Sequence, residues 1–523
     1  MSADRELRTL PSFKLHPPLL WEIFSINAPW ETSMMNISDF HPLTVTRRTS
    51  QVCRVWRQVL LESPSIWGRC FDFDMFSEKE HDQWRDLVLQ RTGQSPLAVM
   101  LHRQKMPPGG HLSDYFMKLL DDQWTRIGKV DLSLWFNDIR MWETFARPAA
   151  SLIFFSVSMF SSRINLPANY QLFSNHAPSL IQLSLPAQQF QLQPNVQQSL
   201  MFNSMRHLQL FQGQGLNGID LLAALQGMPL LEVLEMDITR LGMDNPTATR
   251  DSKISMPRLN SVSVWSSSIS AFPAFLEQLA HPPCCELYLT YSLLLNHLPN
   301  PETTTEYAQS VIKRFLDVSA MNHREVELLM RQDDFITTFG RRVFRLHMKG
   351  HLDAVNRVIF VELVDAMADF KNLDTVSELK LDLFQGRDNP PPECLLGLYR
   401  LFRVMPSVTK LIATPTSVSM LVDPLPFPLL NILKVESIYA ASSSDIGERI
   451  IPFIIYRYIM KAPVGTLDLT QNWFPGDYRV LDKLAGLKVV WNHQGSAQGE
   501  KAAGEYICGS GDTEKLFLHI RRR

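Results

Sequence analysis

The feature that most constrains the fold is a short pattern that recurs along most of the chain. It consists of an apolar residue, two other residues, an apolar residue, one other residue and a third apolar residue. The central residues of its eleven clear copies are Leu183, Leu208, Leu234, Val262, Leu287, Leu346, Leu379, Leu411, Leu433, Leu467 and Leu487, and looser copies lie at Val99, Val130 and Phe155. Alternation over the last three positions is typical of a short strand with one buried face. The pattern therefore predicts a long series of similar strands.

The spacing of the copies indicates the architecture. The first four steps, between residues 183, 208, 234, 262 and 287, are 25, 26, 28 and 25 residues long, and later steps range from 20 to 59. Amphipathic helices are predicted between strands, at residues 219–226, 272–280, 352–370 and 394–404. Residues 95–493 therefore resemble a degenerate leucine-rich-repeat array. The resemblance implies an α/β solenoid, with a curved parallel sheet whose inner face binds other molecules.

A different pattern occupies residues 15–67. Pro17 and Pro18 suit the first turn of a helix. The apolar residues after them, Leu19, Leu20, Ile23 and Phe24, recur at helical spacing and predict one apolar face. A second helical stretch is predicted from about residue 42 to residue 60, and Pro64 ends it. A unit of roughly 50 residues buries little core, so we expect it to leave apolar surface for a partner.

This segment resembles the stretched F-box of large protein families in mushroom-forming fungi. The match is best at its second end, in Val52, Cys53, Trp56, Arg57, Pro64, Ser65 and Trp67. At the first end, His16 replaces a proline of the family pattern and Pro18 replaces an acidic residue. The resemblance implies binding to the Skp-type adaptor of a cullin-based ubiquitin ligase, while the repeats capture a target protein. The residues it implies for adaptor binding are Leu15, Pro17, Leu19, Leu20, Ile23, Phe24, Val52, Cys53, Trp56 and Trp67.

The predicted organisation is therefore an α+β chain with a small all-α module before the solenoid. Residues 1–14 form a tail, 15–67 the F-box-like module, 68–94 a bridging helix and linker, and 494–523 a C-terminal tail that adds a last edge strand at 516–518. A helical insertion is predicted near residues 300–340, with Tyr307, Val311, Ile312 and Phe315 on one face.

Composition disfavours several classes of function. The net charge of −2 disfavours nucleic-acid binding, and apolar runs much shorter than the roughly 20 residues of a membrane helix disfavour membrane insertion. The six cysteines form no C-x-x-C pair, which predicts reduced thiols, no metal site and a cytoplasmic or nuclear location. We expect a protein without cofactors that is not an enzyme.

One motif favours an enzyme instead. Gly213, Gly215 and Gly218 form a G-x-G-x-x-G sequence between a predicted strand and a predicted helix, and Asp237 follows at a strand end. This arrangement is typical of NAD(P)-binding sites, where glycines allow the pyrophosphate to approach the backbone. Since the same strand–helix spacing recurs without glycines, a turn within one repeat is the alternative. For the protein as a whole, the first alternative to the ligase function is a non-catalytic repeat scaffold without ligase docking, and the NAD(P)-binding enzyme is the second.

Overall fold

A computed structural model provides the structure of the chain. It describes residues 15–28, 41–76, 81–102, 110–134, 138–159, 166, 170–186, 200–211, 218–239, 253–267, 275–276, 278–280, 285–292, 324–331, 334–340, 344–349, 361–362, 364–369, 373–385, 392–421, 426–436, 446–471, 476–492 and 503–518. These residues form two compact units. Unit 1 comprises Met1–Leu259 with Gln278–His281, and unit 2 comprises Asn260–Glu277 with Pro282–Arg523.

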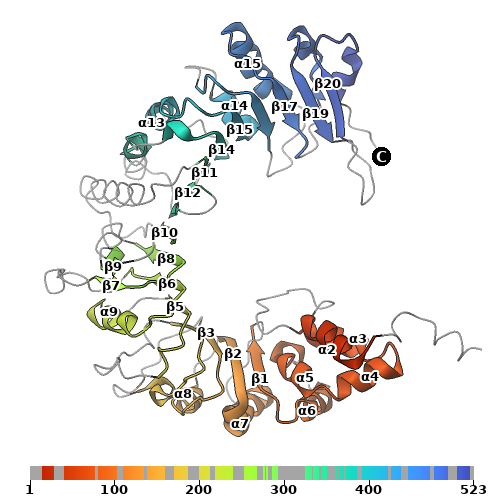
Figure 1. The fold of residues 1–523 in the computed structure, drawn as a ribbon, viewed down its shortest axis with the longest axis vertical. Helices are drawn as coiled ribbons and strands as arrows, with labels where there is room; N and C mark the ends of the chain where they lie inside the picture. The colour runs from red at the N-terminus through yellow and green to blue at the C-terminus, as the bar shows by residue number, and fades with distance from the viewer. Residues whose placement is uncertain are drawn as a thin grey trace, which may run out of the picture. The chain divides into compact units, whose positions relative to one another are not determined.

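Unit 1 begins with short helices (Figure 1). They are α2 (Pro17–Ile26), α3 (Pro42–Thr49), α4 (Arg54–Leu61), α5 (Pro64–Arg69), the 3-10 helix η4 (Phe73–Phe76) and α6 (Asp82–Arg91). Three of them, α2, α3 and α5, carry a proline in the first turn, where a missing N–H removes no helical hydrogen bond.

The prediction of a single helix over residues 42–60 is wrong in one respect, because this segment forms two helices, α3 and α4. The chain leaves the helical path after Thr49, and α4 starts at Arg54 with the thiol of Cys53 accepting the N–H of Trp56 at 3.5 Å. The predicted boundary at residue 67 also falls inside α5, which ends at Arg69. The following helix, α6, packs against α5, so residues 68–94 belong structurally with the helices before them.

The helices of unit 1 lead into a parallel sheet. Its strands are β1 (Leu97–Leu101), β2 (Ile127–Leu134), β3 (Phe154–Met159), β4 (Gln182–Pro186), β5 (His207–Phe211) and β6 (Val233–Asp237). The segments between them include α7 (His111–Gln123), η6 (Trp124–Arg126), α8 (Ile139–Phe145), η7 (Leu172–Asn175) and α9 (Gly218–Gln226). Each strand pairs in parallel with the next one along the chain, and β7 (Ile254–Ser255) pairs separately with β9 (Leu279–Ala280).

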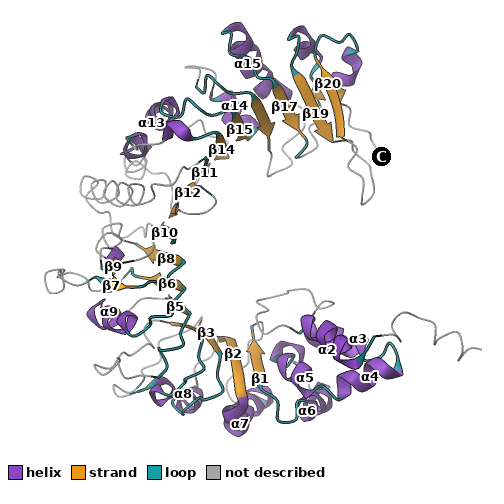
Figure 2. Ribbon diagram, in the orientation of Figure 1, coloured by secondary structure: helices purple, strands orange, loops and turns teal. Residues whose placement is uncertain are grey.

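The register of this sheet confirms the looser copies of the sequence pattern. Their residues and the first three central leucines lie directly opposite one another across the sheet, in the order Val99, Val130, Phe155, Leu183, Leu208 and Leu234. All six are buried. The Phe155 ring lies 5.0 Å from the rings of both Phe145 and Phe173, so this face packs against α8 and η7. Figure 2 shows the helices and strands of this unit coloured by type.

Unit 2 also contains a mostly parallel sheet. Its strands are β8 (Ser261–Ser266), β10 (Glu286–Ser292), β11 (Glu325–Arg331), β12 (Asp334–Phe339), β13 (Phe344–Lys349), β14 (Glu378–Gln385), β15 (Lys410–Ala413), β16 (Ile432–Val435), β17 (Thr466–Leu469), β19 (Lys488–Asn492) and β20 (Ala503–Ile507). The helical segments are η11 (Leu373–Thr375), α13 (Pro392–Arg403), α14 (Pro415–Ser419), α15 (Ile446–Ile459), η12 (Arg479–Lys483) and η13 (Thr513–Leu516). Antiparallel pairing occurs where β12 lies between β11 and β13 and where β20 joins β19.

The structure corrects three predictions for the second half of the repeat region. The predicted helical insertion near 300–340 is wrong for β11 and β12, which are paired strands, while Tyr307, Val311, Ile312 and Phe315 lie outside the described residues. Residues 279–280, predicted as helix, form β9. The edge strand is β20, and β21 (Phe517–Leu518) pairs instead with β18 (Gly476–Asp477). In addition, Leu346 lies opposite Leu289, and Leu287 lies opposite Phe344, so the copy on β13 is displaced by two residues relative to the copy on β10.

Other predictions for this region agree with the structure. All eleven clear copies of the pattern lie in or beside a strand, and the helices predicted at 219–226 and 394–404 correspond to α9 and α13. The chain is thus an α+β protein with mostly parallel sheets.

None of the described helices combines the length and the apolar character needed to cross a bilayer. Five cysteines are free thiols, and Cys284 lies outside the described residues.

Candidate docking surface

An exposed apolar strip runs along α2. Leu19, Ile23 and Ile26 follow one another at steps of four and three residues, so they share one side of the helix. Their side chains are 48%, 45% and 73% exposed, and Leu15 just before the helix is 37% exposed. Four large aliphatic side chains on α2 and just before it are thus in contact with solvent, which is typical of a surface that another molecule covers.

The opposite side of α2 forms the core of the helical module. Leu20 and Phe24 are buried, and the Phe24 ring contacts the Trp56 ring of α4 edge-on at 5.2 Å. Leu60 and Trp67 complete this core, with the Trp67 indole N–H donating to the Leu60 carbonyl at 2.8 Å. The helical module therefore has a buried core formed by its own helices, and the apolar strip on α2 is not part of that core.

The structure divides the ten residues that the sequence singled out. Five of them are exposed, namely Leu15, Pro17, Leu19, Ile23 and Val52. Two are half-buried, namely Cys53 and Trp56. The remaining three, Leu20, Phe24 and Trp67, are buried. The buried three belong to the core of the module rather than to its surface, because Leu20 and Phe24 lie on the side of α2 that faces α4 and Trp67 lies in the interior on α5. The sequence analysis missed Ile26, although its spacing from Ile23 is the signal that places it on the strip.

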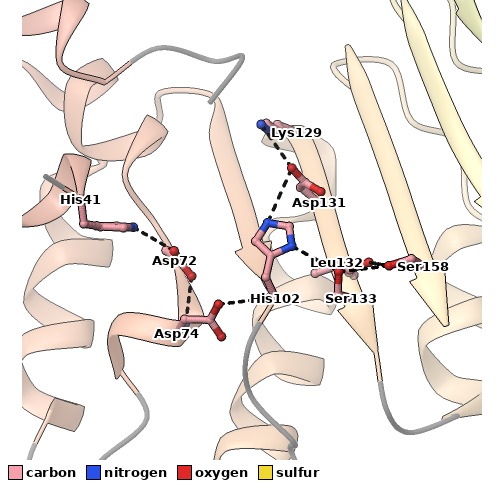
Figure 3. A network of polar contacts seen from close by, with 9 residues as sticks. All are labelled: His41, Asp72, Asp74, His102, Lys129, Asp131, Leu132, Ser133 and Ser158. Carbon is pink, nitrogen blue, oxygen red and sulfur yellow. Dashed lines mark hydrogen bonds and ion pairs between the residues drawn. The ribbon is translucent and has the colours of Figure 1, made fainter. Parts of the chain in front are cut away.

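A chain of polar contacts connects this helical module to the sheet of unit 1 (Figure 3). The His41 ring accepts the N–H of Leu43 at the start of α3 (3.1 Å), and its Nε2 lies 2.8 Å from a carboxylate oxygen of Asp72. The other carboxylate oxygen of Asp72 accepts the N–H of Asp74 at 2.9 Å. Asp74 in turn accepts the N–H of His102, directly after β1, at 2.9 Å. These contacts hold α3 in a defined position relative to β1.

The same chain continues onto β2. The His102 ring lies 3.3 Å from the Ser133 hydroxyl and 3.7 Å from a carboxylate oxygen of Asp131. The same carboxylate oxygen lies 3.5 Å from the ammonium group of the buried Lys129. Serine, histidine and aspartate are the residue types of a catalytic triad. Here, however, the Asp131–His102 distance exceeds a hydrogen bond, and Ser133 accepts a bond from Ser158 at 3.0 Å. The arrangement suits a structural link between strands better than nucleophilic catalysis.

The candidate dinucleotide motif lies partly outside the described residues, which exclude Gly213 and Gly215. Gly218, the last glycine of the motif, starts α9 seven residues after β5 ends at Phe211; the first glycine therefore follows the strand end by two residues in the sequence, whereas the fingerprint places it in a tight turn directly at the strand end. Asp237 accepts the N–H of Thr239 at 2.9 Å, so its carboxylate already stabilises its own turn. The described residues also contain no group of three histidine, cysteine, aspartate or glutamate side chains arranged to hold a metal ion.

The buried Cys70 thiol predicts a pH dependence of stability. It donates to the Ile66 carbonyl at 3.1 Å, and burial raises its pKa from 9.0 to about 12. Above pH 9 the unfolded state loses this proton while the folded state keeps it, so stability falls as pH rises toward 12 by ~1.4 kcal/mol per pH unit. In urea unfolding at pH 8 and pH 10.5, we expect wild type to lose roughly 2 kcal/mol more than Cys70→Ala. Equal losses in both proteins would contradict this assignment.

Comparison with known proteins adds no identification, because neither a protein-family model nor a curated protein matches this chain. The interpretation therefore rests on the chain's own residues and their geometry.

Proposed function

We propose that this chain is a substrate-recognition subunit of an SCF-type ubiquitin ligase and is not itself an enzyme. Its F-box-like helical module binds a Skp-type adaptor, and through it a cullin, while a leucine-rich-repeat-like solenoid binds the target protein. The observation that carries the proposal is the exposed strip of Leu15, Leu19, Ile23 and Ile26 on a module whose own core is complete. Removing such side chains from water contributes roughly 25 cal/mol per Å² of apolar area to a complex, and this contribution must exceed the entropic cost of association.

The sheet face opposite the helices of unit 1 supplies a polar surface for a target. Asp131, Ser156, Ser184, Gln209 and Glu235 form one row across β2 to β6. Gln209 links this row by accepting from Ser184 at 2.6 Å and donating to Glu235 at 2.9 Å, and burial raises the pKa of Glu235. A surface with such ordered hydrogen-bonding groups favours a specific protein partner over a non-specific apolar one.

The polar chain from His41 to His102 supports the same proposal. A receptor without chemistry of its own acts by holding a target near the enzyme that modifies it, which raises the effective concentration of the reacting groups. This effect decreases when the two binding surfaces move independently. Because His41–Asp72 and Asp74–His102 join the helical module to β1, a target bound on unit 1 would be held at a defined position relative to the adaptor.

Co-purification with a Skp-type adaptor tests the proposal. The variant is Leu19→Asp with Ile23→Asp, since both side chains are exposed and their replacement leaves the core formed by Leu20 and Phe24 intact. The matched control is Leu396→Asp with Ile459→Asp, which changes two exposed side chains on α13 and α15 in the same way. We expect a stoichiometric complex for wild type and control and at least a hundredfold weaker binding for the strip variant.

Two results would contradict the proposal. A folded wild-type chain that forms no complex with the adaptor would favour a repeat scaffold without ligase docking. A complex that survives unchanged in the folded strip variant would place the adaptor on another surface. Circular dichroism of each purified variant verifies that it is folded.

A further inference from the structure

A second surface of the helical module carries arginines that form no ion pair with a carboxylate among the residues that the structure describes. Its members, which we name the arginine patch, are Arg47 at the end of α3, Arg54 and Arg57 on α4, and Arg91 at the end of α6. Arg47, Arg54 and Arg57 are exposed and Arg91 is half-buried.

Two tryptophans organise part of the patch. The Arg91 guanidinium lies 4.6 Å from the Trp67 ring centre and 5.5 Å from the Trp84 ring centre, and the Arg47 guanidinium lies 5.4 Å from Trp84. Contact with an aromatic face orients a guanidinium while its N–H groups remain able to bind an anion. Arg47 and Arg91 are therefore held in place before any partner arrives.

The nearby acidic residues do not neutralise these charges. Asp82 and Asp86 of α6 pair with Arg85 on another side of that helix, and Glu62 accepts from Gln58 at 3.0 Å. No ion pair joins any of the four patch arginines to a carboxylate within the described part of the chain. Burial and the nearby charge of Arg57 lower the pKa of Arg91, which shows that like charges face each other here. Bringing an anion to this surface would relieve that repulsion.

We propose that the arginine patch binds an acidic peptide segment of a partner protein. The four cations come from three helices, so a chain with several carboxylates contacts more of them than a single small anion does. Nucleic acid fits less well, because base stacking needs a free aromatic face. Trp67 is buried, and Trp84 already contacts two guanidinium groups. This partner is distinct from the adaptor, whose proposed surface is the apolar strip of α2.

Fluorescence anisotropy with a labelled ten-residue glutamate peptide tests the proposal on the full chain. The test variant is Arg47→Gln with Arg54→Gln and Arg57→Gln, which leaves Arg91 and its tryptophan contacts in place. The control is Arg206→Gln with Arg140→Gln and Arg400→Gln, three exposed arginines outside the helical module that each pair with a carboxylate. We expect the test variant to bind about tenfold or more weakly, since each exposed charge contact contributes roughly twofold to fivefold.

The remaining arms decide between partners. Wild type should bind the glutamate peptide with an affinity that falls as KCl rises, and should not bind a glutamine peptide of equal length. The Leu19→Asp with Ile23→Asp variant should bind it as wild type does, which separates this proposal from adaptor docking. Three outcomes would overturn the proposal: equal binding by test and control variants, full competition by inorganic phosphate at low millimolar concentration, or tighter binding of a ten-nucleotide oligothymidine.

Discussion

Trp67→Ala is expected to destabilise the helical module by ~3–5 kcal/mol, enough to unfold much of it under ordinary conditions. The indole is completely buried, and its ring packs against Trp84 at 6.3 Å and against the Arg91 guanidinium. Truncation leaves a cavity and also removes the donor to the Leu60 carbonyl. Urea unfolding followed by circular dichroism measures the change.

The control for this prediction is Trp67→Phe. Phenylalanine keeps most of the buried ring and loses the hydrogen bond, so we expect a loss of about 1–3 kcal/mol. If Trp67→Ala unfolded within about 0.5 kcal/mol of wild type, the residue would not be a core residue of the module. The F-box resemblance had placed Trp67 at the adaptor, and this experiment separates a core role from a binding role.

The second large effect is expected at Leu208, in the centre of the unit 1 sheet. Leu208 is 1% exposed and lies between Leu183 and Leu234 on neighbouring strands, so Leu208→Ala should cost ~2–5 kcal/mol. Gln209 is its neighbour in sequence but lies on the opposite face of β5. Gln209→Ala removes polar contacts on the half-buried face, and we expect a cost of about 1 kcal/mol or less.

Hydrogen exchange of peptides that cover β4, β5 and β6 measures both variants in the same region. Leu208→Ala should accelerate exchange strongly throughout these strands, whereas Gln209→Ala should leave it close to wild type. Similar acceleration in both would mean that the register differs by one residue, since such a slip exchanges the two faces of a strand.

Local patterns account for much of what the sequence predicted correctly. Alternation around Leu183, Leu208 and Leu234 identified strands that the structure contains, because burial of one face requires that period. Local patterns were insufficient at residues 50–53, where the helix breaks, and at β11 and β12, which the sequence assigned to a helix. In this second case, β11 pairs with β14 and β12 pairs with β13, and this pairing outweighs the local preference for a helix. Strand pairing depends on residues distant in sequence.

The sequence by itself determined that α2 is a helix with apolar residues at positions 19, 20, 23 and 24, and that strands recur with one apolar face. It did not determine which of those apolar residues are exposed. Only the packing of α2 against α4, through Phe24 and Trp56, buried Leu20 and Phe24 and exposed Leu19 and Ile23. The contact between His41 and Asp72, 31 residues apart, is likewise tertiary. Periodicity is a property of neighbours along the chain, whereas burial depends on which distant segment covers a face.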